Sequence, residues 1–359
     1  MLKSIFKYAR RNIISLSVVV ISGYALYLRI ISLYKRELWT DELSQLQALQ
    51  GTFLDLIKVV PVREFCSYLS GDFYLIYPFF KIFAFNKWGL VIPHLIATVI
   101  GFYLLYLLCK RYIKSIWGYL ITFAIVCFNN TLIFHATEIR PYAVLPTLAL
   151  ATFYLLLKIG DLNFKLDTYK RVWAVIFLVF VIWFHVYGVL MFGTSLLFVL
   201  ISKFKDGNFK TILKNAVNFS ALVLGITMPL WLYSVFGPHC IAASFKQPTF
   251  GYIPNPAHNP IGFLKGVFCN LVGDKRLYIL FLGFFVPFFF SYKERGKQLL
   301  LLFINILMPI CLIFISDFVS EYSFIQRQFI WVMPLFAFFL GWSWESFFVL
   351  IKRYKMKVK

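Results

Sequence analysis

Apolar runs that cross or nearly cross the width of a lipid bilayer recur along this whole chain, with short basic segments between them. The runs lie at residues 13–33, 88–108, 116–134, 142–157, 172–186, 187–202, 216–236, 277–290, 299–315 and 329–350. A helix needs about 20 apolar residues to cross a bilayer, so the ends of the shorter runs are approximate. The two runs between residues 172 and 202 also fit one long helix. The pattern predicts an all-α polytopic membrane protein with about ten transmembrane helices.

The charge content supports this fold class. Only 14% of the residues are charged and 61% are hydrophobic, whereas a soluble domain carries about 25% charged residues. A chain with so little charge cannot cover a water-facing surface. Soluble enzymes and soluble binding modules are therefore excluded.

Basic residues outnumber acidic residues by 36 to 15, which gives a net charge of +21. Twenty-three of the basic residues lie in six clusters, at residues 3–11, 110–114, 158–171, 203–214, 293–297 and 352–359. With ten spans and a cytoplasmic N-terminus, all six clusters fall on the cytoplasmic side, as the positive-inside rule requires. The charge therefore needs no nucleic acid as a partner. The sequence predicts a multi-pass protein with both termini in the cytoplasm.

Two segments on the opposite, outer side are long. The segment 34–87 mixes apolar and polar residues at helical spacing, which is typical of helices that lie in the membrane interface. Its end, 73–85, is apolar over too few residues for a span, which favours an interfacial or re-entrant helix. The segment 237–276 contains five prolines and is predicted to be a loop over the outer face. Cys240 and Cys269 lie in it, either as a disulfide or as two thiols.

The sharpest local feature is the sequence Leu-Trp-Thr-Asp-Glu at residues 38–42, just after the first run. The adjacent carboxylates of Asp41 and Glu42 are suited to holding a cation or to accepting a proton from an incoming hydroxyl. The alternative is that Asp41 is the N-cap of the helix that follows. The spacing alone leaves both interpretations open.

A second feature is the sequence Thr-Glu-Ile-Arg-Pro-Tyr at residues 137–142. Pro141 suits the first position of a helix. Arg140, at the interface, is well placed to bind a phosphate, because its guanidinium offers a fork of donors and keeps its charge. The alternative roles are a structural pair between Glu138 and Arg140, or an arginine that extends toward the lipid headgroups.

Three further candidates lie at the outer ends of other runs. His185 occupies an outer turn, where a lone histidine is more often structural than a ligand. Arg327 enters the last run from the outer side and is a second candidate for a phosphate contact. Arg29 lies near the outer end of the first run, and an ionisable group at membrane depth is a functional candidate by default, although it can also extend toward the headgroups.

These segments, in this order, resemble the GT-C superfamily of polyprenyl-phosphate-sugar-dependent glycosyltransferases. The most similar branch is protein-mannosyltransferase-like and includes the RgtA/B/C/D-like and aminoarabinose-transferase (ArnT-like) families. The resemblance is carried by the Arg29 run leading into LWTDELSQLQAL, by FHATEIRPYAV, by the FHVYG turn, by MPLWL at 228–232 and by IQRQFIWVMPLF near the end. It covers nearly the whole chain. It implies one GT-C-type transmembrane domain over residues 1–359, in a plasma (inner) membrane, with interfacial helices in the first outer segment.

The resemblance also implies an activity and a set of site residues. The family moves one sugar from a polyprenyl monophosphate to an acceptor at the outer, periplasmic face of the membrane, with inversion. Asp41 matches its proposed catalytic base, with Glu42 beside it. The segment with Glu138, Arg140 and Tyr142 matches the family's E-x-R-P-Y segment near the carrier headgroup. The remaining matches are His185 with Tyr187, which correspond to an H-Y-Y turn, and Arg327, which precedes the last motif.

The chain departs from the family at one position. Where relatives commonly read His-Pro-Pro, this sequence reads Asp72-Phe73-Tyr74, so an acid takes the place of the histidine. Asp41, Glu42 and Asp72 offer hard oxygen ligands of the kind that a divalent metal ion prefers. A metal role for them is left open, and no other cofactor is predicted.

Two competing functions remain. A transporter or flippase for a lipid-linked sugar would do no chemistry, and such proteins have repeated halves with a midplane site, whereas no internal repeat is found here. A non-catalytic subunit of an envelope assembly would tolerate the loss of Asp41. The sequence predicts a glycosyltransferase, and it does not name the sugar or say whether the acceptor is a glycan, a lipid or a protein.

Overall fold

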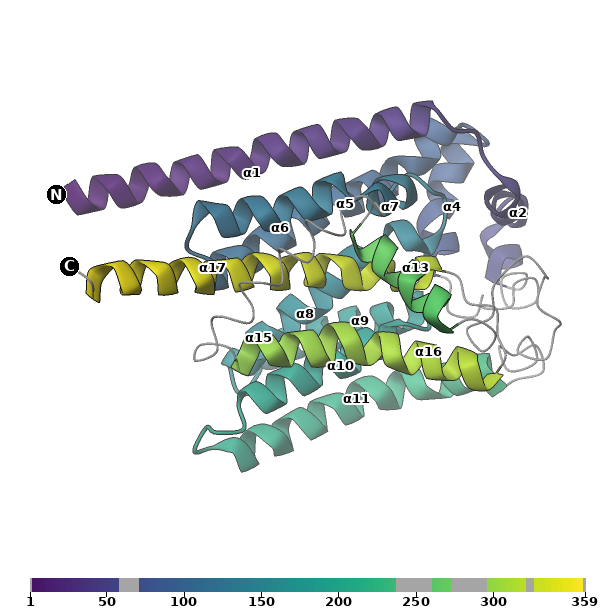
Figure 1. Cartoon of the computed structure of the whole chain (residues 1–359). Helices are drawn as coiled ribbons and strands as arrows, with labels where there is room; N and C mark the ends of the chain where they lie inside the picture. The colour runs from purple at the N-terminus through teal and green to yellow at the C-terminus, as the bar shows by residue number, and fades with distance from the viewer. Residues whose placement is uncertain (1, 58–70, 237–259, 273–295, 321–325, 358–359) are drawn as a thin grey trace.

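The computed structural model of the chain describes residues 2–57, 71–236, 260–272, 296–320 and 326–357. The regular elements within these ranges are all helices, as predicted. The long helices run side by side, and the start of α1 and the end of α17 lie at the same end of the bundle (Figure 1). The long elements are α1 Leu2–Tyr34, α5 Lys87–Tyr112, α6 Ile116–Phe128, α8 Leu145–Asp161, α9 Thr168–Phe184, α10 Gly188–Ser202, α11 Phe209–Phe236 and α17 Met333–Lys357. One more long helix runs from α15 Gly296–Leu300 through a π-helical stretch, η5 Leu301–Leu307, into α16 Met308–Ser320.

Short elements connect the long ones. They are α2 Thr40–Ala48, α4 Gly71–Phe83, α7 Asn130–His135, α13 Pro260–Val272 and the 3₁₀ helices η2 Pro141–Ala143 and η6 Gln326–Val332. The helices α2 and α4 lie at the end of the bundle opposite the start of α1 (Figure 1). We call this end the site end.

Nine of the ten predicted runs coincide with helices, and the run 277–290 lies outside the described residues. By length and composition, four of the described helical stretches can cross a membrane: Asn12–Tyr34, Lys87–Tyr112, Phe209–Pro229 and Gly296–Ile315. Three shorter apolar helices accompany them: Ile116–Phe128, Gly188–Ser202 and Phe329–Glu345. The all-α membrane fold is confirmed, whereas the number of ten spans stays a prediction.

Two details of the helices were not settled by the sequence. The run 116–134 is not one helix, because Asn129 ends α6 and starts α7, and its side-chain oxygen accepts a hydrogen bond from the Leu132 amide at 3.0 Å. An asparagine side chain competes for backbone donors in this way and favours a helix start. Residues 172–202 form two helices, α9 and α10, separated by a turn at His185 rather than one long helix.

The helices α6 and α17 pack against each other at very short range. A Cβ atom built on Gly341 would lie 1.9 Å from the Thr122 hydroxyl and 2.5 Å from the Gly118 carbonyl oxygen. Only glycine fits at this position, because any side chain would push the two backbones apart. Close contact through small residues is how membrane helices gain packing energy.

A small apolar core at the site end is separate from the main core of the bundle. It joins the end of α1, the helices α2 and α4, the start of α5 and the segment before η2. Its buried members are Leu33, Leu46, Leu49, Leu56, Phe73, Ile76, Phe80, Leu90, Val91 and Ile139. The helices of the first outer segment are thus fixed to the bundle by apolar packing. Most of the second outer segment, including Cys240, lies outside the described residues, so the pairing of that cysteine stays open.

Candidate active site

Asp41 lies in the first turn of α2, and its side chain is 40% exposed. The helix begins at Thr40 after Trp39 as the N-cap residue, so the alternative that Asp41 is the N-cap is wrong. The buried residues of α2 are Glu42, Gln45 and Leu46, and Asp41 lies at the edge of this buried face, one turn before Gln45. Asp41 therefore offers an accessible carboxylate at the site end.

Arg140 faces Asp41 from another part of the chain. The guanidinium Nη2 lies 3.9 Å from Asp41 Oδ2, and the Arg140 side chain is 16% exposed. Arg140 is in extended backbone directly before Pro141, the first residue of η2, as the proline position predicts. A charge-assisted hydrogen bond is about 2.7–2.9 Å long. The two charges thus attract each other across a separation longer than a hydrogen bond.

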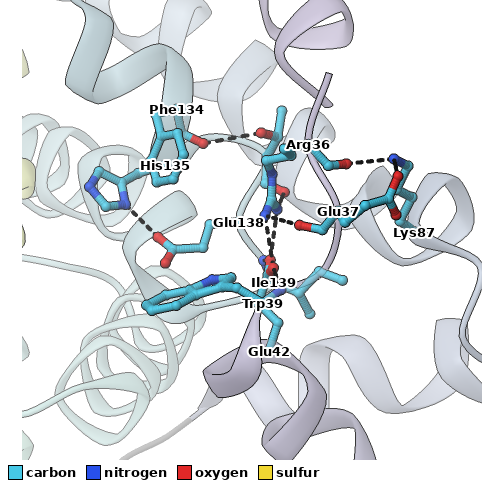
Figure 2. Close-up of polar contacts among 10 residues, drawn as sticks. Arg36, Glu37, Trp39, Glu42, Lys87, Phe134, His135, Glu138 and Ile139 are labelled. Carbon is cyan, nitrogen blue, oxygen red and sulfur yellow. Dashed lines mark hydrogen bonds and ion pairs between the residues drawn. The ribbon is translucent and has the colours of Figure 1, made fainter. Parts of the chain in front are cut away.

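Glu42 is completely buried, and donors surround its carboxylate (Figure 2). Arg36 Nη1 donates to Oε2 at 2.8 Å and Nη2 donates to Oε1 at 2.7 Å. The amide of Trp39 donates to Oε2 at 3.1 Å, and the amide of Ile139 donates to Oε1 at 2.6 Å. Arg36 also donates to the carbonyl of Thr137. Glu42 and Arg36 therefore join the start of α2 to the segment that precedes η2.

Glu138 is buried in the same segment, and its carboxylate binds the Nδ1 atom of His135 (Figure 2). The His135 ring belongs to a row of rings that links α7, η2, the α9–α10 turn and η6. The row consists of His135, Tyr142, His185, Tyr187 and Trp331, with successive ring centroids 6.1, 6.3, 4.7 and 6.3 Å apart. The structure thus brings together the predicted site residues Tyr142, His185 and Tyr187.

The tight α9–α10 turn holds His185 in the middle of this row. The amide of Tyr187 donates to His185 Nδ1 at 3.3 Å, which fixes that nitrogen as the acceptor. Burial and, after it, the charge of Arg140 lower the pKa of His185 to about 4, and Asp72 opposes this shift. His185 is therefore neutral at neutral pH, although it lies beside an arginine.

This shift predicts a loss of stability in acid. Because the pKa of His185 is lower in the folded protein than its usual 6.5, the unfolded chain binds more protons between those values. The free energy of unfolding should therefore fall by about 1–3 kcal/mol as the pH drops from about 6.5 to about 4. The check is the melting temperature of the purified protein across this pH range. The variant His185→Gln should lose this part of the pH dependence, and an equally steep acid loss in the variant would contradict the prediction.

Asp72, at the start of α4, belongs to a buried polar network. Gln45 Nε2 donates to Oδ2 at 2.7 Å, and His94 Nε2 lies 2.9 Å from Oδ1. Each of the three side chains is 0% exposed. Asp72 is thus enclosed between α2, α4 and α5 and acts electrostatically on His185.

The described residues do not fit the metal role that the sequence leaves open for Asp41, Glu42 and Asp72. Within the described ranges, no group of three or more His, Cys, Asp or Glu side chains is placed to hold a metal ion. Four donors occupy the lone pairs of Glu42 that a cation would need. Asp72 is fully buried, with Gln45 and His94 against its two oxygens.

Arg29 lies deep between α1 and α6, with 2% of its surface exposed. Its guanidinium donates to the carbonyls of Ala25, Val126 and Cys127 at 2.9–3.4 Å. The last two are at the C-terminal end of α6, where carbonyls lack helical partners and a cation is favoured by the helix dipole. Arg29 also lines a cavity of about 30 Å³ with Tyr142. Its predicted role as a phosphate contact stays a prediction.

Arg327 lies in the first turn of η6, and its side chain is outside the described part of the structure. Its predicted contact with phosphate stays a prediction. Trp331, four residues further along η6, is described, and its ring contact with Tyr187 places η6 at the site.

The sequence pattern did not identify Arg36, Gln45 or His94. A signal was present for Arg36, because it is a basic residue in an outer segment, where the positive-inside rule disfavours arginine. No local signal was present for Gln45 and His94. They meet Asp72 from positions 27 and 22 residues away, and only the packing of three helices brings them together.

The sequence matches no known family model and no curated protein. Two solved structures are similar in fold. One is ArnT from Cupriavidus metallidurans in the apo state, with a TM-score of 0.60 and 16% sequence identity over 92% of this chain and 59% of that chain. The other is ArnT from Cupriavidus metallidurans bound to undecaprenyl phosphate, with a TM-score of 0.59 and 16% identity over 91% and 59% of the two chains.

This chain therefore spans less than two thirds of the length of ArnT. The likeness covers nearly all of the present chain, and the apolar helices described above agree with it. At this level of identity the likeness establishes architecture rather than chemistry. Over the residues that the structure describes, the chain has the helical fold of ArnT.

Proposed function

We propose that this chain is an integral-membrane glycosyltransferase that moves one sugar from a polyprenyl monophosphate to the hydroxyl of an acceptor, with inversion. The observation that carries the proposal is the pair formed by Asp41 and Arg140, 3.9 Å apart at the site end of an ArnT-like fold. One of the two ArnT structures has undecaprenyl phosphate bound, which supports a lipid-linked phosphate as the donor here.

The pair supplies the two groups that the reaction needs. As the acceptor oxygen attacks the anomeric carbon, its proton passes to the Asp41 carboxylate, which acts as general base. The bond between the anomeric carbon and the phosphate oxygen breaks, and its electron pair goes to that oxygen. The polyprenyl phosphate then carries one more negative charge than the donor did.

Arg140 is assigned to this developing charge. Its guanidinium keeps its proton at any working pH and presents a fork of donors that matches phosphate oxygens. Because the phosphate gains charge as the bond breaks, Arg140 binds the transition state more strongly than the intact donor. Tyr142 and His185, whose ring centroids lie 6.3 Å apart, are assigned to the wall of the site, and His185 is uncharged at neutral pH.

The proposed orientation places the site end at the outer face of the plasma (inner) membrane and both termini in the cytoplasm. Two observations support it. The start of α1 and the end of α17 lie together at the opposite end of the bundle (Figure 1). The six basic clusters of the sequence agree with a cytoplasmic location for that end.

The test is the release of polyprenyl phosphate from a panel of labelled polyprenyl-phosphate sugars in membranes that contain the protein. A crude envelope fraction supplies the acceptor, and membranes without the protein are the control. Release from one donor, together with transfer of its label to acceptor, is the expected result. Movement of an intact donor across vesicle membranes without release would instead identify a transporter, and the absence of both would overturn the proposed function.

A further inference from the structure

The contacts of Glu42 are unlike those of a reacting carboxylate. Four donors converge on its two oxygens: two guanidinium nitrogens of Arg36 and the amides of Trp39 and Ile139 (Figure 2). A carboxylate has about four lone-pair sites, so these donors leave no site for a substrate proton. With none of its surface exposed, Glu42 is also out of reach of an acceptor.

Arg36 holds two segments of the chain together. Its side chain is 13% exposed, and it donates to Glu42 on α2 and to the carbonyl of Thr137 in the segment before η2. That carbonyl lies 101 positions further along the chain. The backbone of Arg36 is fixed in turn, because Lys87 Nζ donates to its carbonyl at 2.5 Å.

Asp41 and Arg140, the proposed reacting pair, are sequence neighbours of residues in the hydrogen-bond network of Glu42. Asp41 precedes Glu42 in sequence, and Arg140 follows Ile139, whose amide Glu42 binds. Each reacting side chain is thus one peptide unit away from a residue that takes part in the network. A shift of Glu42 relative to Ile139 would therefore change the distance between Asp41 and Arg140.

We infer that Arg36 and Glu42 form a clamp that sets the spacing of Asp41 and Arg140, which makes them positioning residues for the proposed transfer reaction. The expected effect of the clamp on the transfer rate rests on the proposed function. Its expected effect on the structure does not. The bidentate geometry matters as well as the charge, because two parallel donors fix the orientation of both partners.

The first arm of the experiment measures the clamp without any activity. Hydrogen–deuterium exchange is followed in peptides covering residues 136–141, for the wild type and the variants Glu42→Gln and Arg36→Lys. The Ile139 amide is expected to exchange faster in both variants than in the wild type, because each substitution breaks the bidentate pairing of Arg36 with Glu42. The matched control is Glu37→Gln, since Glu37 pairs with Lys87 at 3.2 Å in the same segment and is 90% exposed. It should leave the exchange unchanged.

The second arm measures the release of polyprenyl phosphate at saturating donor. Because a misplacement of about 1 Å can cost about 100-fold in rate, we expect kcat to fall about 10- to 100-fold in Glu42→Gln and Arg36→Lys. The KM for the donor should change less, and Glu37→Gln should match the wild type. The double variant Arg36→Lys/Arg140→Lys should lose less kcat than the product of the two single losses. The reason is that both substitutions disturb the same spacing, that between Asp41 and Arg140.

The two arms separate the clamp from the proposed function. If the wild type transfers no sugar, the proposed function fails, and the exchange data still decide whether the clamp exists. Unchanged exchange of Ile139 in Glu42→Gln and in Arg36→Lys would overturn the clamp. So would a loss of kcat in Glu42→Gln with unaltered exchange, because Glu42 would then be a reacting group. Should Glu42→Gln fail to fold, Arg36→Lys alone decides both arms.

Discussion

Replacing Asp41 with Asn is expected to slow sugar transfer by about 10²- to 10⁴-fold, the usual contribution of a general base. The amide has nearly the same shape as the carboxylate but cannot take the proton of the acceptor hydroxyl. The Asp41 side chain is 40% exposed at the start of α2. The substitution should therefore lower the free energy of unfolding only slightly. The measurement is the rate of polyprenyl phosphate release at matched protein levels.

The control for this variant is Glu37→Gln, which removes another acid from the same outer segment. Glu37 is exposed and contacts Lys87 rather than Arg140. It should therefore keep the wild-type rate. A rate for Asp41→Asn within about threefold of the wild type would remove Asp41 from the mechanism, because such a change is far below the contribution of a general base.

The second large effect is expected at Arg140. Its replacement by Gln removes the charge that we propose stabilises the leaving phosphate, and the loss of such a preorganised donor costs about 10²- to 10³-fold in kcat. Arg140→Lys should recover part of this loss, because lysine restores the charge without the fork of donors. The measurements are kcat for transfer and the Kd of polyprenyl phosphate for each variant.

Exposed arginines elsewhere provide the control. Arg171, at the start of α9, is exposed and donates to the carbonyl of Leu166, so Arg171→Gln should leave kcat and Kd unchanged. If Arg140→Gln weakened the binding of polyprenyl phosphate and its donor equally, with kcat unaltered, Arg140 would contribute uniform binding rather than transition-state stabilisation. That result would contradict the proposed role.

The sequence predicted the helices well because their signals are local. The apolar runs set the helix cores, and short-range caps set several ends, as at Asn86, Ser115 and Asp167, whose side chains each accept a hydrogen bond from the first turn of the following helix. The break at Asn129 is of the same local kind, yet an apolar run on both sides concealed it.

The site was predicted less completely because its contacts are long-range. Asp41 and Arg140 were both identified, and the structure places them together from positions 99 residues apart. The pattern treated Glu42 as an equal of Asp41, because adjacent residues share a sequence signal although a helix points them to different faces. The enclosure of Asp72 by His94 follows from tertiary packing, which no local pattern encodes. Arg36 and Glu42 are only six residues apart, but the sequence pattern did not show that their side chains pair.

The helices α6 and α10 are shorter than the hydrocarbon core of a bilayer is thick. Its 13 residues span about 20 Å at 1.5 Å per residue, and the 15 residues of α10 span about 23 Å. The hydrocarbon core of a bilayer is about 30 Å thick. A membrane accommodates an apolar helix shorter than its hydrocarbon core by thinning or by flanking side chains that reach the interface. The bilayer is therefore expected to be thinner beside α6 and α10 than beside α1 and α5, which are long enough to cross it.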